Sequence, residues 1–362
     1  MKLRTETDTR RYNAIDAAKF AAAICVIMIH IPPFGAAEEG SVFQTMNFWI
    51  QACLTRLAVP FFFISSGFFL YRKTTLASFE LRPSKAYVAR VFRLYMIWSA
   101  IYLPITLLEI IRGRGNLLRE AAEYLRNVVF VGSYTHLWYL NALIVAVCVT
   151  SFLLYKKVKP CTIAGIAFAF YAIGLLGESW FGLLKPLREA APAIWNALKL
   201  SAGVIVTTRN GLFFGFLFVS IGMVLAFYVP ELSRRRAAAL FAGSMLLMIA
   251  EVSLLESRGA PREHDMYLFL VPAAFFLFCL IREIRLPDQA RYPLLRKMSA
   301  LMFYTHLWVN WAVRRLMLRL GVSMVNSPVR FLLVLGITLV LSWGICALSG
   351  RKRFSFLKIL CS

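Results

Sequence analysis

The sequence predicts an all-α, polytopic integral membrane protein, and two observations carry this prediction. The first is composition: 60% of the 362 residues are hydrophobic and only 16% are charged, whereas soluble domains are nearer to about 25% charged. So few charges cannot cover the surface of a soluble globule of this size. The second is the recurrence of apolar runs of about 20 residues, the length that crosses a bilayer as a helix.

About ten of these runs are expected to be transmembrane helices of one membrane domain, 1–362. The first run is longer than the apolar core of a signal peptide, which has ~7–15 residues, so we expect it to be retained. The weakly amphipathic segment 181–208 favours an interfacial or re-entrant helix. The expected spans are 14–32, 47–71, 86–111, 136–155, 161–180, 209–229, 237–257, 264–283, 298–318 and 330–350.

The distribution of Lys and Arg among the loops predicts the orientation. With the N-terminus inside, the inner segments carry 22 Lys or Arg and the outer segments carry 10. Cytoplasmic loops are enriched in these residues. We therefore expect both termini in the cytoplasm and the protein in the inner (plasma) membrane as a multi-pass protein.

Charge and cysteine usage exclude several functional classes. The net charge of +23 would suggest nucleic-acid binding in a soluble protein, but here the basic residues lie in short loops, where they face lipid headgroups. We expect membrane lipid as a partner and no nucleic acid. The seven cysteines form no CxxC pair, so neither a metal site nor a disulfide framework is expected.

Polar residues within the expected spans are the candidates for function, because a charge at mid-bilayer costs at least ~2.5 kcal/mol. Lys19 and His30 are eleven residues apart, which places them on one helix face about 16 Å apart. An imidazole is a suitable base at neutral pH. A single histidine on a helix is nevertheless more often structural.

Two further segments allow alternative interpretations. The Pro60–Gly67 stretch, with Ser65 and Ser66, is either a packed, kinked helix or the lining of a site. The basic residues after it, which include Arg90 and Arg93, suit either anionic lipid or the phosphates of a nucleotide-like cofactor. Composition does not choose between them.

Taken in order along the chain, these residues resemble acyltransferase family 3. The matching pieces are Arg11-Tyr12…Ile15-Asp16…Lys19…His30, Val59–Phe68, Arg90…Arg93-Leu94-Tyr95, His136–Leu140 and Ser299–His306. Arg209–Phe216 and His264–Tyr267 are also similar to the membrane half of the vancomycin-resistance serine/alanine racemases. No stretch resembles their soluble racemase domain, so racemase activity is not expected.

The resemblance implies an O-acyltransferase that takes an acyl group, usually acetyl, from cytoplasmic acyl-CoA. The acceptor is a hydroxyl of an envelope glycan, a lipid or a small molecule. His30 matches the essential histidine of the family, and His306 ends the Ser299–His306 piece, which looks like the family's closing element, so both are expected to be catalytic. Lys19 stands where the family usually has arginine, which keeps the charge but loses the bidentate fork.

The resemblance and the polar residues of the spans also suggest donor-binding and substrate-binding residues. Arg90 and Arg93, with Lys19, are expected to bind the acyl-CoA donor. The resemblance implies no metal, and either direct transfer or an unlinked periplasmic partner. The expected substrate-binding residues are Ser65, Ser66, His136, Arg209, Glu251 and Asp265.

Two other functions stay open on the sequence. One is a transporter of a small polar molecule such as an amino acid, which often shows inverted repeats; none is visible here. The other is a non-catalytic scaffold or sensor, in which replacing His30 would affect only stability.

Overall fold

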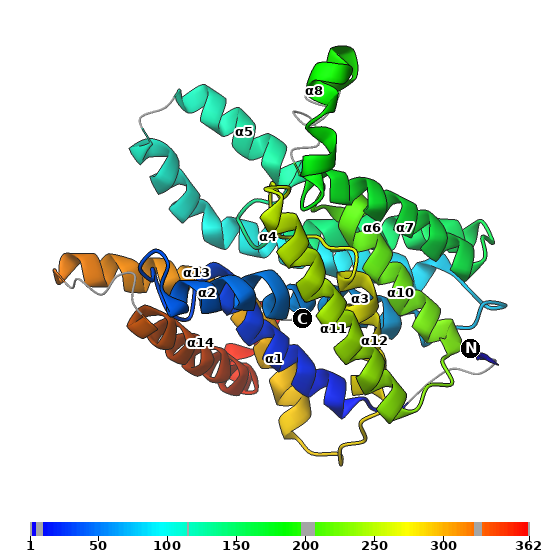
Figure 1. Ribbon diagram of the computed structural model, residues 1–362. Helices are drawn as coiled ribbons and strands as arrows, with labels where there is room; N and C mark the ends of the chain where they lie inside the picture. The colour runs from blue at the N-terminus through cyan, green and yellow to red at the C-terminus, as the bar shows by residue number, and fades with distance from the viewer. Residues whose placement is uncertain (1, 5–9, 114–115, 197–206, 322–327, 361–362) are drawn as a thin grey trace. The chain divides into compact units, whose positions relative to one another are not determined.

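The computed structural model of the protein describes residues 2–4, 10–113, 116–196, 207–321 and 328–360. The regular secondary structure of the described chain is helical apart from two short strands (Figure 1). It divides into two compact units. Unit 1 comprises 1–9 and 63–280, and unit 2 comprises 10–62 and 281–362. The boundaries fall within helices α3 (Ala58–Tyr71) and α12 (Leu270–Arg282).

Unit 1 is built around α10 (Phe216–Phe227), whose twelve residues are all buried. A helix that is apolar on every side is expected to be surrounded by other helices, because none of its faces favours contact with water. α6 (Trp138–Tyr155) and α7 (Pro160–Gly177) pack against α10. The other elements of this unit are β1 (Lys2–Leu3), most of α3, α4 (Leu81–Arg112), α5 (Leu117–Phe130), η3 (Phe181–Leu184), α8 (Leu187–Ala190), η4 (Gly211–Gly215), β2 (Tyr228–Val229), α11 (Arg234–Ser257) and most of α12.

Two glycines allow α3 and α10 to cross in close contact. A Cβ atom on Gly222 would overlap the carbonyl oxygen of Ile64, and a Cβ on Gly67 would overlap that of Val219. Small residues at helix crossings allow this approach in membrane proteins. The Gly67 of the predicted kinked segment is therefore a packing residue.

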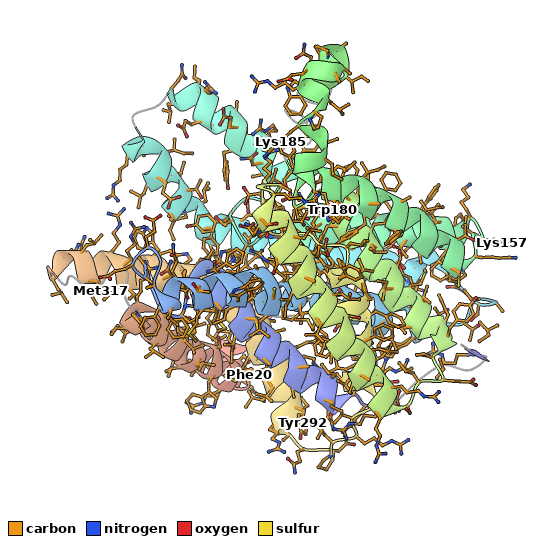
Figure 2. All side chains as sticks on the ribbon, in the orientation of Figure 1. Phe20, Lys157, Trp180, Lys185, Tyr292 and Met317 are labelled. Carbon is orange, nitrogen blue, oxygen red and sulfur yellow. The ribbon has the colours of Figure 1, made fainter. Side chains whose placement is uncertain are left out.

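The loops of unit 1 gather at two ends. At one end β1 pairs antiparallel with β2, and the Arg4 guanidinium donates to the carbonyl of Arg72 at 2.7 Å. At the other end, the backbone N–H of Gly182 donates to the Ala260 carbonyl at 2.8 Å. Figure 2 labels Lys157 and Trp180 just beyond the two ends of α7. Each end thus collects loops for which the sequence predicts the same side of the membrane.

Unit 2 contains a three-helix core of α1 (Asn13–His30), α13 (Arg291–Arg319) and α14 (Pro328–Ser349). Tyr292 and Met317 lie near the two ends of α13 in Figure 2. The other elements are α2 (Val42–Trp49), η1 (Ile50–Leu54), η2 (Thr55–Leu57), the start of α3 and η6 (Lys352–Leu360). The buried core comprises Ala23, Ile27, Ile31, Met302, Val309, Val313, Met317, Phe331 and Val334.

The expected all-α membrane fold is confirmed at the level of helices. A helix lies at each of the ten predicted positions, and seven helical stretches among the described residues are long and apolar enough to cross a membrane. Gly211–Phe227 and Leu270–Arg282 are apolar but shorter. α13 is long but carries charged residues at both ends.

Several predicted boundaries are wrong in ways that matter for the site. Arg209, His136 and Asp265 lie in loops before η4, α6 and α12, and are not inside spanning helices. Hydropathy placed them in spans because aromatic and apolar neighbours flank them. The predicted loop 112–135 contains the amphipathic helix α5, and 181–208 contains η3 and α8, with 197–206 outside the described residues.

Candidate functional site

The two predicted catalytic histidines lie together in unit 2. His30 is the last residue of α1, and His306 lies in the middle of α13. Their ring centroids are 5.3 Å apart, with the ring planes inclined by 33°. His306 is fully buried and His30 is half-buried. The packing of α1 on α13 therefore creates a histidine pair from residues 276 positions apart in the sequence.

The backbone fixes the tautomer of His306. Its Nδ1 lies 3.0 Å from the carbonyl oxygen of Met302, one turn earlier in α13. A carbonyl only accepts, so Nδ1 carries the proton and Nε2 carries the lone pair. Of the two ring nitrogens, Nε2 is thus the one able to take a proton from a hydroxyl.

The predicted donor-binding cations are distributed over both units. Lys19 is half-buried on α1 of unit 2, on the helix that ends in His30. Arg90 and Arg93 are exposed on α4 of unit 1, three residues apart and hence on one helix face. The Arg90 guanidinium stacks on the Tyr87 ring, 5.1 Å from its centroid.

Three predicted substrate-binding residues line the interior of unit 1. Ser65 is fully buried in α3. The Ser66 hydroxyl lies 3.3 Å from the Tyr139 hydroxyl of α6. His136 is buried in the loop before α6, with its ring 4.9 Å from that of Tyr102 in an edge-on contact.

Glu251 of α11 has a carboxylate that is engaged by three donors. It accepts from the Trp180 indole N–H at 2.7 Å and from the backbone N–H groups of Leu268 and Phe269 at 2.8 and 2.9 Å. Hydrogen bonds to a charged acceptor are among the stronger ones. Glu251 therefore fixes the position of the loop that precedes α12 through its hydrogen bonds to Leu268 and Phe269.

Arg209 and Asp265 meet as an ion pair at the end of unit 1 where η3 begins. Their closest N–O distance is 2.6 Å, and their side chains are 31% and 11% exposed. The guanidinium also stacks on the Trp138 ring, 4.9 Å from its centroid. Asn210 follows and caps η4, because its side chain accepts from the backbone N–H groups of Leu212 and Phe213.

This ion pair lines a polar cavity of about 240 Å³, which we call the Glu178 pocket. Its lining residues are Glu178, Thr207, Arg209, Arg262, Glu263 and Asp265. The Thr207 hydroxyl donates to Glu178 at 2.8 Å and accepts from the backbone N–H of Arg209 at 3.0 Å. The backbone N–H of Arg262 donates to the Glu178 carbonyl at 3.0 Å, which ties the loop that carries Arg262 to the end of α7.

Glu178 lies just beyond the end of α7 and is only 2% exposed. Burial, followed by the nearby carboxylate of Asp265, raises the pKa of Glu178 to about 7, against the opposing effects of the Thr207 hydrogen bond and Arg209. Its Oε2 atom has no hydrogen-bond partner among the described residues. Perturbed carboxyl groups of this kind concentrate at functional sites.

The sequence reasoning missed four residues of this pocket: Glu178, Thr207, Arg262 and Glu263. The signal for Glu178 was present, since it is the first charged residue after an apolar run that begins at 160. The other three lie in loops that only the fold brings to Glu178. Within the described residues, no group of His, Cys, Asp and Glu is arranged to hold a metal ion.

Comparison with known proteins adds to this geometry. An acyltransferase domain matches residues 12–347. A serine/alanine racemase of Enterococcus gallinarum is 27% identical over 354 residues, which are 96% of this chain and 47% of the relative. An amino-acid racemase of Enterococcus faecalis is 29% identical over 279 residues, 77% of this chain and 37% of the relative. The chain thus spans about half or less of the curated relatives it matches, and no solved structure matches it.

Proposed function

The chain belongs to acyltransferase family 3, and on this premise we propose that it is a multi-pass membrane O-acyltransferase. It takes an acyl group, with acetyl as the first choice, from acyl-CoA and places it on a hydroxyl of an envelope glycan, a lipid or a small molecule. The observation that carries the proposal is the pairing of His30 with His306 at 5.3 Å. Two histidines on well-packed helices can provide the base that acyl transfer requires.

In the proposed step, the acceptor oxygen attacks the thioester carbonyl carbon and the carbon–sulfur bond breaks. The hydroxyl proton passes to an imidazole nitrogen, with Nε2 of His306 available for it, and then to the thiolate of CoA. His30 either shares this proton or stabilises the charge on its neighbour. The products are an ester and free CoA, so atoms and charges balance without a further reactant or a metal.

Cationic side chains support the donor assignment. Lys19 lies on the helix that carries His30, while Arg90 and Arg93 expose their guanidinium groups on α4. Arginine and lysine both bind phosphate groups, which CoA supplies. The excess of Lys and Arg in the inner loops supports cytoplasmic termini in the plasma membrane. In this orientation the acyl-CoA donor arrives from the cytoplasm.

A second candidate is transport of a small polar molecule such as an amino acid. The specific observation in its favour is the Glu178 pocket, a charged cavity among helices of a membrane protein. The relatives are named amino-acid and serine/alanine racemases, and these names agree with this class of molecule. This candidate predicts uptake into vesicles without any release of CoA from acetyl-CoA.

The test is CoA release from acetyl-CoA by the purified full chain in nanodiscs. We expect His306→Gln and His30→Ala to lower the rate by at least about a hundredfold, the usual contribution of a general base. His264→Ala is the matched control, because His264 bonds the Tyr267 hydroxyl in unit 1. CoA binding should persist in all three variants.

Two results would overturn the proposal. If neither CoA nor acetyl-CoA binds the wild-type protein, the donor assignment fails. If CoA is released at the same rate in wild type and in both histidine variants, the histidine pair has no part in the chemistry.

A further inference from the structure

We propose that the Glu178 pocket is a binding site for a small zwitterion. The ammonium group of this ligand pairs with the Glu178 carboxylate, and its carboxylate pairs with the Arg262 guanidinium. The assignment of this ligand as the acyl acceptor rests on the proposed function, whereas its binding does not.

Glu178 is a buried carboxyl group with one unsatisfied oxygen among the described residues. A carboxyl group that is only 2% exposed needs partners, because burying a polar group without a hydrogen bond costs several kcal/mol. One carboxyl oxygen receives the Thr207 hydroxyl at 2.8 Å. The other has no partner among the described residues and belongs to a side chain that lines the cavity. A ligand that donates a hydrogen bond would satisfy it.

The charges around Glu178 decide the kind of donor. Asp265 and Glu263 also line the pocket and both raise the pKa of Glu178. Arg209, a cation that also lines the pocket, is already paired with Asp265 at 2.6 Å. A cationic donor gains from this excess of carboxylates, and an ammonium group has three donors to offer them.

Arg262 supplies the second half of the recognition. Arg262 is exposed and is one of the residues that line the pocket, and within the described chain its side chain forms no ion pair or hydrogen bond. Its backbone N–H donates to the Glu178 carbonyl at 3.0 Å, so the two loops that carry the cation and the buried carboxyl group are tied together. An arginine fork binds a carboxylate with defined geometry.

The size and lining of the pocket match a small charged solute. A cavity of about 240 Å³ holds roughly eight water molecules at about 30 Å³ each, which is room for a solute of that many heavy atoms. All six lining residues are polar or charged, whereas pockets for larger ligands are mostly apolar and about 300–1,000 Å³.

The experiment compares three probes on the purified full chain in nanodiscs by isothermal titration. L-Serine carries both charged groups, ethanolamine lacks the carboxylate, and glycerate lacks the ammonium group. We expect serine to bind at least tenfold more tightly than either. Glu178→Gln should weaken serine at least tenfold, and Arg262→Gln should remove the preference for serine over ethanolamine. Glu189→Gln, at an exposed glutamate outside the pocket, should change nothing.

The pH dependence provides a second readout. Because ammonium binding requires ionised Glu178, the affinity for serine should rise between pH 6 and pH 8 in wild type and stay flat in Glu178→Gln. The other charged groups that line the pocket with Glu178 are Asp265, Arg209, Glu263 and Arg262.

The outcomes separate this inference from the proposed function. Serine binding without histidine-dependent CoA release would keep the site and refute the acyltransferase. CoA release to other acceptors with no serine binding, or with equal affinity for serine and glycerate, would refute the site. Melting curves show whether Glu178→Gln is folded, and Arg262→Gln tests the site independently of it.

Discussion

The buried carboxyl group of Glu178 makes a quantitative prediction about stability. Its pKa is raised from 4.5 to about 7 in the folded protein, a difference of 2.5 units, and one unit corresponds to about 1.36 kcal/mol. The ionised form therefore costs the folded state about 3 kcal/mol. This cost is absent below about pH 4.5, grows as the pH rises, and is complete above about pH 7.

Replacing Glu178 with glutamine removes this pH dependence, because the amide has a similar shape and no charge to desolvate. The difference in unfolding free energy, Glu178→Gln minus wild type, should rise by about 2.5 kcal/mol from pH 5 to pH 8. The assay is denaturant unfolding of both proteins in the same detergent at several pH values. Other titrating groups contribute equally to both proteins and cancel in the difference.

A flat difference across this pH range would refute the reasoning, because it would mean that Glu178 titrates with its ordinary pKa. A difference that falls as the pH rises would have the same consequence, since it would show that the ionised carboxylate is stabilised by the fold. Glu189→Gln again serves as the control, with no change expected at an exposed glutamate.

Three further predictions concern packing and loop positions, each read from unfolding in detergent. Gly222→Ala should destabilise the protein by roughly 1–3 kcal/mol, because the added methyl group would overlap the Ile64 carbonyl; Gly243→Ala, with open space around its Cβ, should be neutral or stabilising, and equal effects would contradict the close crossing. Glu251→Ala should cost about 3 kcal/mol by leaving three donors unsatisfied, and a neutral result would show that water replaces the carboxylate. Asn210→Ala should cost about 1 kcal/mol through loss of the η4 cap, with no loss expected if the turn is held by packing alone.

Hydrophobicity predicted the helix positions well because every segment that crosses a bilayer needs about 20 mostly apolar residues in a helix. The α10 run, for example, is apolar on all faces and is buried on all faces. Boundaries were less predictable: Asp265 was expected inside a span, yet the helix begins only at Leu270. Apolar residues in the preceding loop are buried too, as Met266 and Tyr267 show, so hydropathy does not distinguish them from helix.

For the candidate site residues, the sequence predicted which residues matter but not which of them lie together. His30 and His306 were both named from the sequence through the order of the family motifs. Their proximity is a property of α1 packing on α13. Arg209 and Asp265 were named as separate candidates, and the fold makes them an ion pair.

The sequence by itself determined that this is a membrane protein, because composition shows it. It also determined the helical architecture through the length of the apolar runs, and the family through the order of the motifs. Only the tertiary structure decided that Glu178 is buried beside Arg209 and Asp265. These residues come from three loops, and their distances depend on how α7, η4 and α12 end or begin against one another. A raised pKa and an unsatisfied oxygen arise from that juxtaposition, which no local pattern records.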